Sequence, residues 1–91
     1  MGIMTVFVVS YDLNNPGQSY DDLYKAIKSI GPWWHYLDST WLVSTNLTAK
    51  NIYDRLSPHL DSNDRILIIE AGKNWHARLN DQAYQWIRLH L

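Results

Sequence analysis

The 91-residue chain contains no cysteine. A disulfide framework, a thiolate zinc site and a cysteine nucleophile are therefore excluded together, and the composition agrees with a reducing compartment. No apolar run approaches the roughly 18 residues that a membrane span needs, so we expect no membrane partner. The beginning of the chain, Met1-Gly2-Ile3-Met4, has neither a basic stretch nor a cleavable apolar segment. We therefore read no signal peptide and expect a cytoplasmic protein.

The chain also has few glycines and almost no net charge. The four glycines are scattered at Gly2, Gly17, Gly31 and Gly72. This spacing excludes Gly-x-Gly-x-x-Gly and Walker-type loops, so we expect no organic nucleotide cofactor. Eight Lys and Arg against nine Asp and Glu give a net charge of −1. Such a chain does not hold polyanions by bulk charge, and any contact with RNA or DNA must be local.

Hydrophobic residues are plentiful, at 46% of the chain with five Trp and six Tyr. This composition is too apolar for disorder. The length predicts a single domain over residues 1–91. A chain of this size buries roughly 60–65% of its unfolded surface, which gives a modest core and favours self-association.

Several segments have the β-branched and aromatic composition of strands. They are residues 5–11, 33–38, 40–45, 65–70 and, as a fifth edge strand, 75–79. The first has apolar residues on both faces and predicts a central strand. Asp38-Ser39 predicts a tight turn between the second and the third.

The first helix is predicted over residues 20–30. Ser19 is expected to cap it, with Asp22 as the capping-box partner. Apolar residues at spacings of three and four form one stripe along it. Gly31 is expected to supply a left-handed cap, and the proline after it forbids continuation.

Thr48 predicts the cap of a second helix over 49–56, and Asn80 that of a last helix. The order β-α-β-β-α-β predicts an α+β, ferredoxin-like domain with one antiparallel sheet and two helices on one face. Its core spans 5–70, and 71–91 form a C-terminal strand and helix extension. The apolar residues left on the other sheet face need a partner, most simply a second copy, so we expect a homodimer.

Asp12 is the best candidate for a catalytic or metal-binding residue. It follows a buried strand directly and precedes a Pro16-Gly17 turn, where a carboxylate is held rigidly but open to solvent. In a sheet-to-sheet dimer two Asp12 carboxylates can meet and bind a hard divalent cation such as Mg²⁺ or Mn²⁺. That arrangement suits phosphodiester hydrolysis. The alternative, which the sequence pattern alone favours, is that Asp12 caps the following turn through its side chain.

The four histidines lack zinc-ligand spacing, and no dedicated zinc site is expected. His35 and His76 each lie beside a tryptophan, which suits a general base or nucleobase stacking, although plain packing is the favoured alternative.

RNA-recognition modules share the predicted strand order and read bases with strand aromatics, here Phe7, Tyr11 and Trp41. Their Arg/Lys-Gly-Phe run is missing from the third strand. We take Tyr11, Lys25 and Lys28 as candidate nucleic-acid contacts, against the alternative that the lysines form an ordinary solvated face.

The run Val8-Val9-Ser10-Tyr11-Asp12-Leu13 resembles the first-strand signature of the CRISPR-associated adaptation endonucleases and of the related virulence-associated protein D ribonucleases. The resemblance covers about residues 5–70 and includes the segments 37–42 and 64–68. The whole chain, including 33–41 and the Trp-rich tail, is similar to short bacterial and phage proteins labelled SinR family.

This resemblance implies a homodimer in which the first-strand aspartates, Asp12 here, face each other and hold a divalent metal in members that cut nucleic acid. Other members act only as dimeric scaffolds. Leu42 stands where the family has a glutamate, and the net charge of −1 lacks the basic surface of a duplex-DNA platform. Two hypotheses rank first: a metal-dependent endonuclease acting on RNA rather than duplex DNA, and a non-catalytic dimeric interaction module in a mobile-element or defence locus. A third is single-stranded RNA binding through exposed aromatic side chains.

Overall fold

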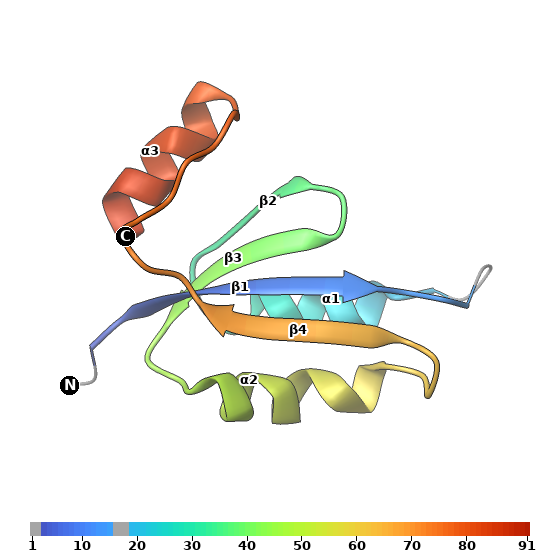
Figure 1. The fold of residues 1–91 in the computed structure, drawn as a ribbon. Helices are drawn as coiled ribbons and strands as arrows, with labels where there is room; N and C mark the ends of the chain where they lie inside the picture. Colours follow the sequence, from blue (N-terminus) through green and yellow to red (C-terminus); the bar gives the residue numbers. More distant parts are fainter. Residues whose placement is uncertain (1–2, 16–18) are drawn as a thin grey trace.

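The computed structural model describes residues 3–15 and 19–91. The elements, labelled in Figure 1, are β1 (Thr5–Asp12), α1 (Asp21–Lys28), β2 (Trp33–Leu37), β3 (Thr40–Thr45), α2 (Ala49–Leu56), the short 3₁₀ turn η1 (Ser57–His59), β4 (Arg65–Glu70) and α3 (Asp81–His90). The predicted α+β class with an antiparallel sheet is confirmed. None of the helices described is long and apolar enough to cross a bilayer.

The four strands form one sheet in the order β2-β3-β1-β4, and each strand is antiparallel to its neighbours. Since β3 lies between β1 and β2 and is antiparallel to both, β1 and β2 run in the same direction. Because β1 lies between β3 and β4, the predicted central position of the first strand is confirmed. The turn at Asp38-Ser39 joins β2 to β3 as expected.

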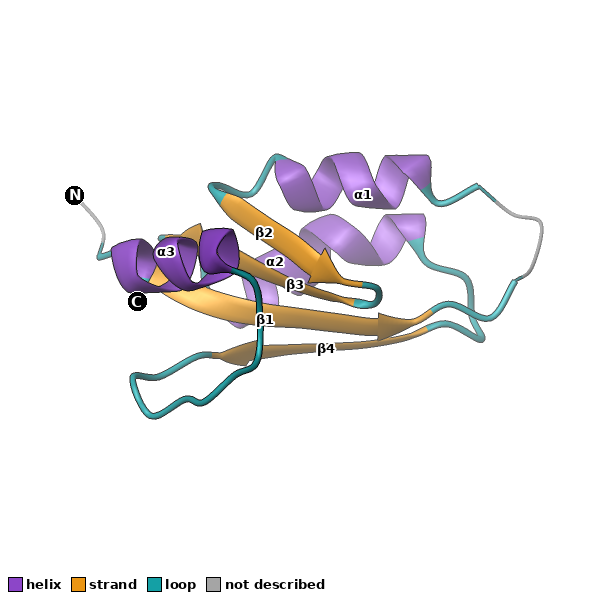
Figure 2. Ribbon diagram, turned by 90° about the horizontal axis from the view of Figure 1, so that it is seen from above, coloured by secondary structure: helices purple, strands orange, loops and turns teal. Residues whose placement is uncertain are grey.

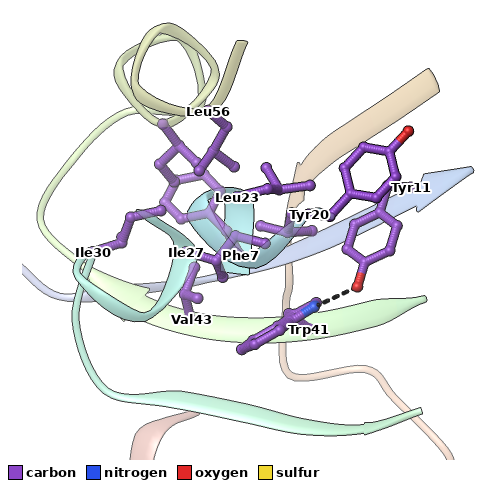
Figure 3. Close-up of a cluster of buried hydrophobic side chains, with 11 residues drawn as sticks. Phe7, Tyr11, Tyr20, Leu23, Ile27, Ile30, Trp41, Val43 and Leu56 are labelled. Carbon is purple, nitrogen blue, oxygen red and sulfur yellow. Dashed lines mark hydrogen bonds between the residues drawn. The ribbon is translucent and has the colours of Figure 1, made fainter. Parts of the chain in front are cut away.

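Helices α1 and α2 lie on one face of the sheet and enclose the main core (Figure 2). Phe7, Val9 and Tyr11, which alternate along β1, face these helices because successive strand residues point to opposite faces. Figure 3 shows Phe7 and Tyr11 in one cluster with apolar side chains of both helices, among them Leu23 and Leu56, which have no exposed surface. Full burial of one such aliphatic side chain contributes about 1.5–3 kcal/mol.

Two of the three predicted helix caps are confirmed. The Thr48 hydroxyl accepts from the Asn51 backbone N–H at 3.1 Å, and the Asn51 side chain accepts from the Thr48 N–H, which completes a capping box. The Asn80 side chain accepts from a backbone N–H three residues later at 2.8 Å. The prediction for Ser19 was wrong, because the helix begins one residue later and Tyr20 occupies the cap position without a side-chain bond.

The left-handed cap predicted at Gly31 was wrong as well. Its φ lies outside the left-handed range, and the lack of a side chain serves a close approach instead. A Cβ at this position would overlap the backbone carbonyl oxygen of Ser44. The neighbouring Pro32 carbonyl accepts from the Ser44 N–H at 2.8 Å, so Gly31 lets the chain come close enough to β3 to begin β2.

Helix α3 covers part of the opposite sheet face (Figure 2). It contacts β2 and buries Ala83 and Ile87. The Tyr36 hydroxyl of β2 donates to the Gln82 side chain at 3.0 Å. The fifth edge strand predicted over 75–79 is absent from the described structure, because backbone groups of this segment bond to the Tyr84 hydroxyl instead of a strand edge.

Candidate functional site

The sheet face away from α1 and α2, here called the open face, carries the even-numbered residues of β1. Its β2 side lies under α3, whereas its β4 side is uncovered. Leu67 and Ile69 are there 58% and 53% exposed. Ile69 pairs with Val8 of β1, and the three side chains form an apolar strip, here called the β4 strip.

Asp12 ends β1 on the open face, beyond the end of the β4 strip. It is exposed, and its cross-strand partner is Arg65 at the start of β4. Both residues line a shallow hollow of about 260 Å³ together with Ser10 and Leu67. The Arg65 guanidinium donates to the Asp64 backbone carbonyl at 3.1 Å, which holds it close to the chain. The hollow therefore offers one carboxylate and one guanidinium to a ligand.

Within the described residues, the Asp12 side chain does not cap the following turn, which was the alternative role. Its carboxylate has no hydrogen bond there, while its backbone carbonyl accepts from the Asn14 side chain at 3.3 Å. The Pro16-Gly17 part of the predicted turn lies outside the described residues. The loop is held by another carboxylate, that of Asp64.

Asp64, which no sequence pattern singles out, is buried directly before β4. It accepts from the backbone N–H groups of Asn14 and Asp61, each at 2.8 Å, and from the Tyr20 hydroxyl at 3.0 Å. Burial alone would raise the pKa of Asp64, but these three donors outweigh it and lower the pKa below its usual value. Burial, followed by the Asp64 carboxylate, raises the pKa of Tyr20.

Asparagine side chains extend the link between the two loops. The Asn14 side chain donates to the Asn63 carbonyl at 2.8 Å, and that of Asn15 donates to the Asp61 carboxylate and the Asn63 side chain. The loop after β1 is thereby fastened to the loop before β4, which fixes Asp12 and Arg65 side by side. No periodic pattern could have revealed a network whose members lie almost 50 positions apart.

Possible metal ligands are not clustered in the described residues. Within residues 3–15 and 19–91 no three His, Asp or Glu side chains are grouped to hold a metal. Asp12, the predicted metal ligand, is the carboxylate that lines the hollow on the open face. The Asp64 oxygens accept hydrogen bonds from their own donors.

The predicted nucleic-acid contacts do not meet at this hollow. Tyr11 is 8% exposed, and its hydroxyl accepts from the Trp41 indole N–H at 3.0 Å (Figure 3). Burial raises the pKa of Tyr11 and leaves its ring without the exposed face that base stacking needs. Phe7 and Trp41 lie in the same core. Lys25 and Lys28 are exposed on α1, across the sheet from Asp12.

The packing predicted for His35 is confirmed, whereas His76 is exposed. The His35 ring stacks on Trp41 with centroids 3.8 Å apart and planes 10° apart, and its Nε2 bonds to the Asp38 carbonyl at 3.1 Å. His76 lines a groove beside α3. Neither lies in the hollow at Asp12.

No model of a known protein family matches the chain, and no solved structure matches it. The open face carries an apolar strip, with an exposed carboxylate and a guanidinium side by side beyond its end. A second surface packed on the strip would shield the strip from water and lie next to the carboxylate. The β4 strip and Asp12 are therefore the features of the open face that bear on function.

Proposed function

We propose that the chain functions as a homodimer that associates with nucleic acid and hydrolyses phosphodiester bonds in RNA at a pair of Asp12 carboxylates. The observation that carries this proposal is the β4 strip, with its exposed Leu67 and Ile69 leading to Asp12. Two such strips can cover each other about a twofold axis, because a twofold contact uses the same patch on both copies. We place the axis at the Asp12 end of the strip.

In this dimer the two carboxylates hold Mg²⁺ or Mn²⁺, which prefer oxygen ligands. The cation supplies a water activated for attack and offsets the charge that develops on the phosphate. Arg65, beside Asp12 in the hollow, is suited to bind two phosphate oxygens by two parallel hydrogen bonds. RNA is favoured over duplex DNA because a net charge of −1 gives no broad basic surface for a duplex.

The second candidate is a dimer that cuts nothing and serves as an interaction module in a mobile-element or defence locus. A specific observation favours it. Arg65 is the cross-strand neighbour of Asp12, and a fixed positive charge there weakens the affinity of the site for a cation. The β4 strip serves both candidates equally, so dimerisation is common to them.

The fold supports placing the chain among ferredoxin-like domains. In that arrangement a strand-helix-strand unit is split by a third strand between its two parallel members, and here β3 lies between β1 and β2. With the aspartate that ends β1, this favours the superfamily of CRISPR-adaptation endonucleases and virulence-associated protein D, and within it the SinR-like group. In this proposal the protein works in the cytoplasm, where RNA is available.

Dimerisation is tested by sedimentation equilibrium of the full chain. The wild type is expected to form dimers, and Leu67→Asp and Ile69→Asp are expected to sediment as monomers because each would bury an unpaired charge. Leu89→Asp is the matched control, since Leu89 is 80% exposed on α3 and lies outside the strip. Equal association of all four proteins would rule out the β4 strip as the interface.

Cleavage is tested with end-labelled single-stranded RNA and duplex DNA, with Mg²⁺, with Mn²⁺ and with chelator. Wild-type protein is expected to cut RNA only with metal, and Asp12→Asn to fall to the level of the chelated reaction. Asp22→Asn, an exposed carboxylate on α1, is the control and should cut like the wild type. Undiminished cutting by Asp12→Asn contradicts the assigned role, and a wild-type dimer that cuts neither substrate contradicts the nuclease and favours the interaction module.

A further inference from the structure

The charges of the chain are unevenly divided between its core and its C-terminal segment. Residues 71–91 contain three Lys or Arg and one Asp, a net charge of +2, whereas residues 1–70 contain five against eight and carry −3. The three cations, Lys73, Arg78 and Arg88, are exposed, and none of them forms an ion pair in the part of the chain that the structure describes. The segment therefore presents free positive charge, which the net charge of −1 for the whole chain conceals.

Two aromatic rings lie among these cations. The Trp75 ring packs on that of Tyr84 with centroids 6.4 Å and planes 28° apart, and the Arg88 guanidinium lies 5.8 Å from the centroid of the Tyr84 ring. The Tyr84 hydroxyl donates to the Ala77 carbonyl at 2.8 Å and accepts from the backbone N–H two residues further on at 3.1 Å. These bonds hold the backbone on both sides of Arg78. We call Trp75, Arg78, Tyr84 and Arg88 the C-terminal surface.

Part of the Trp75 ring is open to a second planar group. The residue is 40% exposed, the same fraction as Trp33 on the helix side of the sheet, and Tyr84 supports its ring on one side. Proteins bind single-stranded nucleic acid by combining such rings with cations, because bases stack on the rings and the cations contact the phosphates. The bases of a duplex are already stacked on each other, so the combination favours a single strand.

We propose that the C-terminal surface binds single-stranded RNA, with a base stacked on Trp75 and neighbouring phosphates held by Arg78 and Arg88. Arginine suits this role because its guanidinium binds phosphate oxygens by paired hydrogen bonds. Helix α3 lies on the same side of the sheet as the open face that carries Asp12 (Figure 2), so a strand bound here is on the face of that carboxylate. The inference rests on the proposed association with nucleic acid, and it holds whether or not the strand is cut.

The test is the fluorescence anisotropy of a labelled single-stranded oligouridine with chelator present, so that binding is measured without cleavage. Its counterpart is an abasic ribose-phosphate oligomer with the same number of phosphates. Wild-type protein is expected to bind the oligouridine about 5- to 160-fold more tightly, the value of stacking one base. The affinity should fall with salt at a logarithmic slope of about −2 for contacts by Lys73, Arg78 and Arg88. Arg78→Gln and Arg88→Gln should each reduce that slope by about 0.7.

Variants of the ring separate stacking from charge. Trp75→Ala should bind the two oligomers equally, and Trp75→Phe, which keeps a ring, should still prefer the oligouridine. Trp33→Ala is the control matched in exposure, and Arg55→Gln, on α2, is the control matched in charge; both should bind like the wild type. Circular dichroism reports the folding of every variant. If Trp75→Ala fails to fold, the abasic comparison with wild-type protein and the two arginine variants decide.

Three results would each overturn the inference. One is a wild-type protein that binds neither oligomer, or both equally. Another is wild-type affinity in Trp75→Ala, Arg78→Gln and Arg88→Gln, which would place the RNA elsewhere and leave the association with nucleic acid standing. The last is binding of polyglutamate as tight as that of the oligouridine at the same salt concentration, which would identify an acidic polypeptide as the occupant. Binding as expected by a protein that does not cut RNA with metal would uphold the inference and overturn the nuclease alone.

Discussion

Replacing Gly31 by alanine tests whether the start of β2 depends on a close backbone approach. The added methyl group would overlap the Ser44 carbonyl oxygen, which is backbone and lies next to the last residue of β3. To make room, the chain must move away from β3, and this movement strains the 2.8 Å bond from the Ser44 N–H to the Pro32 carbonyl. Overpacking of this kind costs about 1–3 kcal/mol.

One opposing effect must be set against that cost. Alanine restricts the unfolded chain more than glycine does, which stabilises the native state by about 0.4–1 kcal/mol where the backbone conformation allows it. Because the obstacle is backbone rather than the end of a flexible side chain, we expect the strain to dominate and the free energy of unfolding to fall by about 1–2 kcal/mol. For a domain of this size that lowers the Tm by about 4–16 °C.

The assay is urea unfolding followed by far-ultraviolet circular dichroism, with thermal unfolding as a second measure. The control is Gly72→Ala, since an added Cβ at Gly72 meets no heavy atom within 4 Å and its φ is not left-handed. It should be neutral or stabilise by up to about 1 kcal/mol. If Gly31→Ala unfolds at the same urea concentration as Gly72→Ala, the close approach does not limit the fold and the reasoning fails.

Three further predictions concern the core and the buried carboxylate. Leu56→Ala, which empties a fully buried position, should lower the free energy of unfolding by about 2–5 kcal/mol in the same urea assay, and a loss below about 1 kcal/mol would show that the core can collapse around it. Tyr11→Phe should cost about 1–3 kcal/mol, because it removes the acceptor of the buried Trp41 indole; an unchanged urea midpoint would mean that the indole finds another partner. Asp64→Asn should lower the urea midpoint at pH 7. Because folding lowers the pKa of Asp64, its carboxylate stabilises the protein above the unfolded pKa near 3.9, and this stabilisation is lost as the pH falls through the lower folded value. The gap between the variant and wild type should therefore narrow on acidification, and a gap of constant size would contradict the role of the ionised form; Asp22→Asn is the exposed control.

Features set by local sequence were predictable, and features set by distant contacts were not. The Thr48 cap, the Asp38-Ser39 turn and the strand at 65–70 depend on neighbouring residues, and the structure has all three. The role of Gly31 depends on Ser44, which only the folded sheet brings near. A left-handed cap and a close approach both call for glycine, so the residue type could not distinguish them.

The candidate site likewise combines features that the sequence predicts with features that depend on distant contacts. Asp12 could be located from the sequence because it directly follows a buried strand, and it lies at the exposed end of β1 as expected. Strand alternation could also have shown that Tyr11 points to the opposite face from Asp12, toward the helices. By contrast, the binding of Asn14 by Asp64 joins residues 50 positions apart. Hydrogen-bond partners at that separation follow only from the packed structure.

The attachment of α3 has a consequence for the order in which the protein opens. The ten-residue helix is shorter than the about 12–15 residues that an isolated helix needs in water, so it holds its shape only while docked on β2. Release of α3 from β2, which would expose Ala83 and Ile87 and break the Tyr36 to Gln82 contact, would therefore melt the helix and open the groove beside Trp34 while β1, β3 and the two other helices stayed folded. Amide protons of α3 would then exchange with solvent well before those of the central strands.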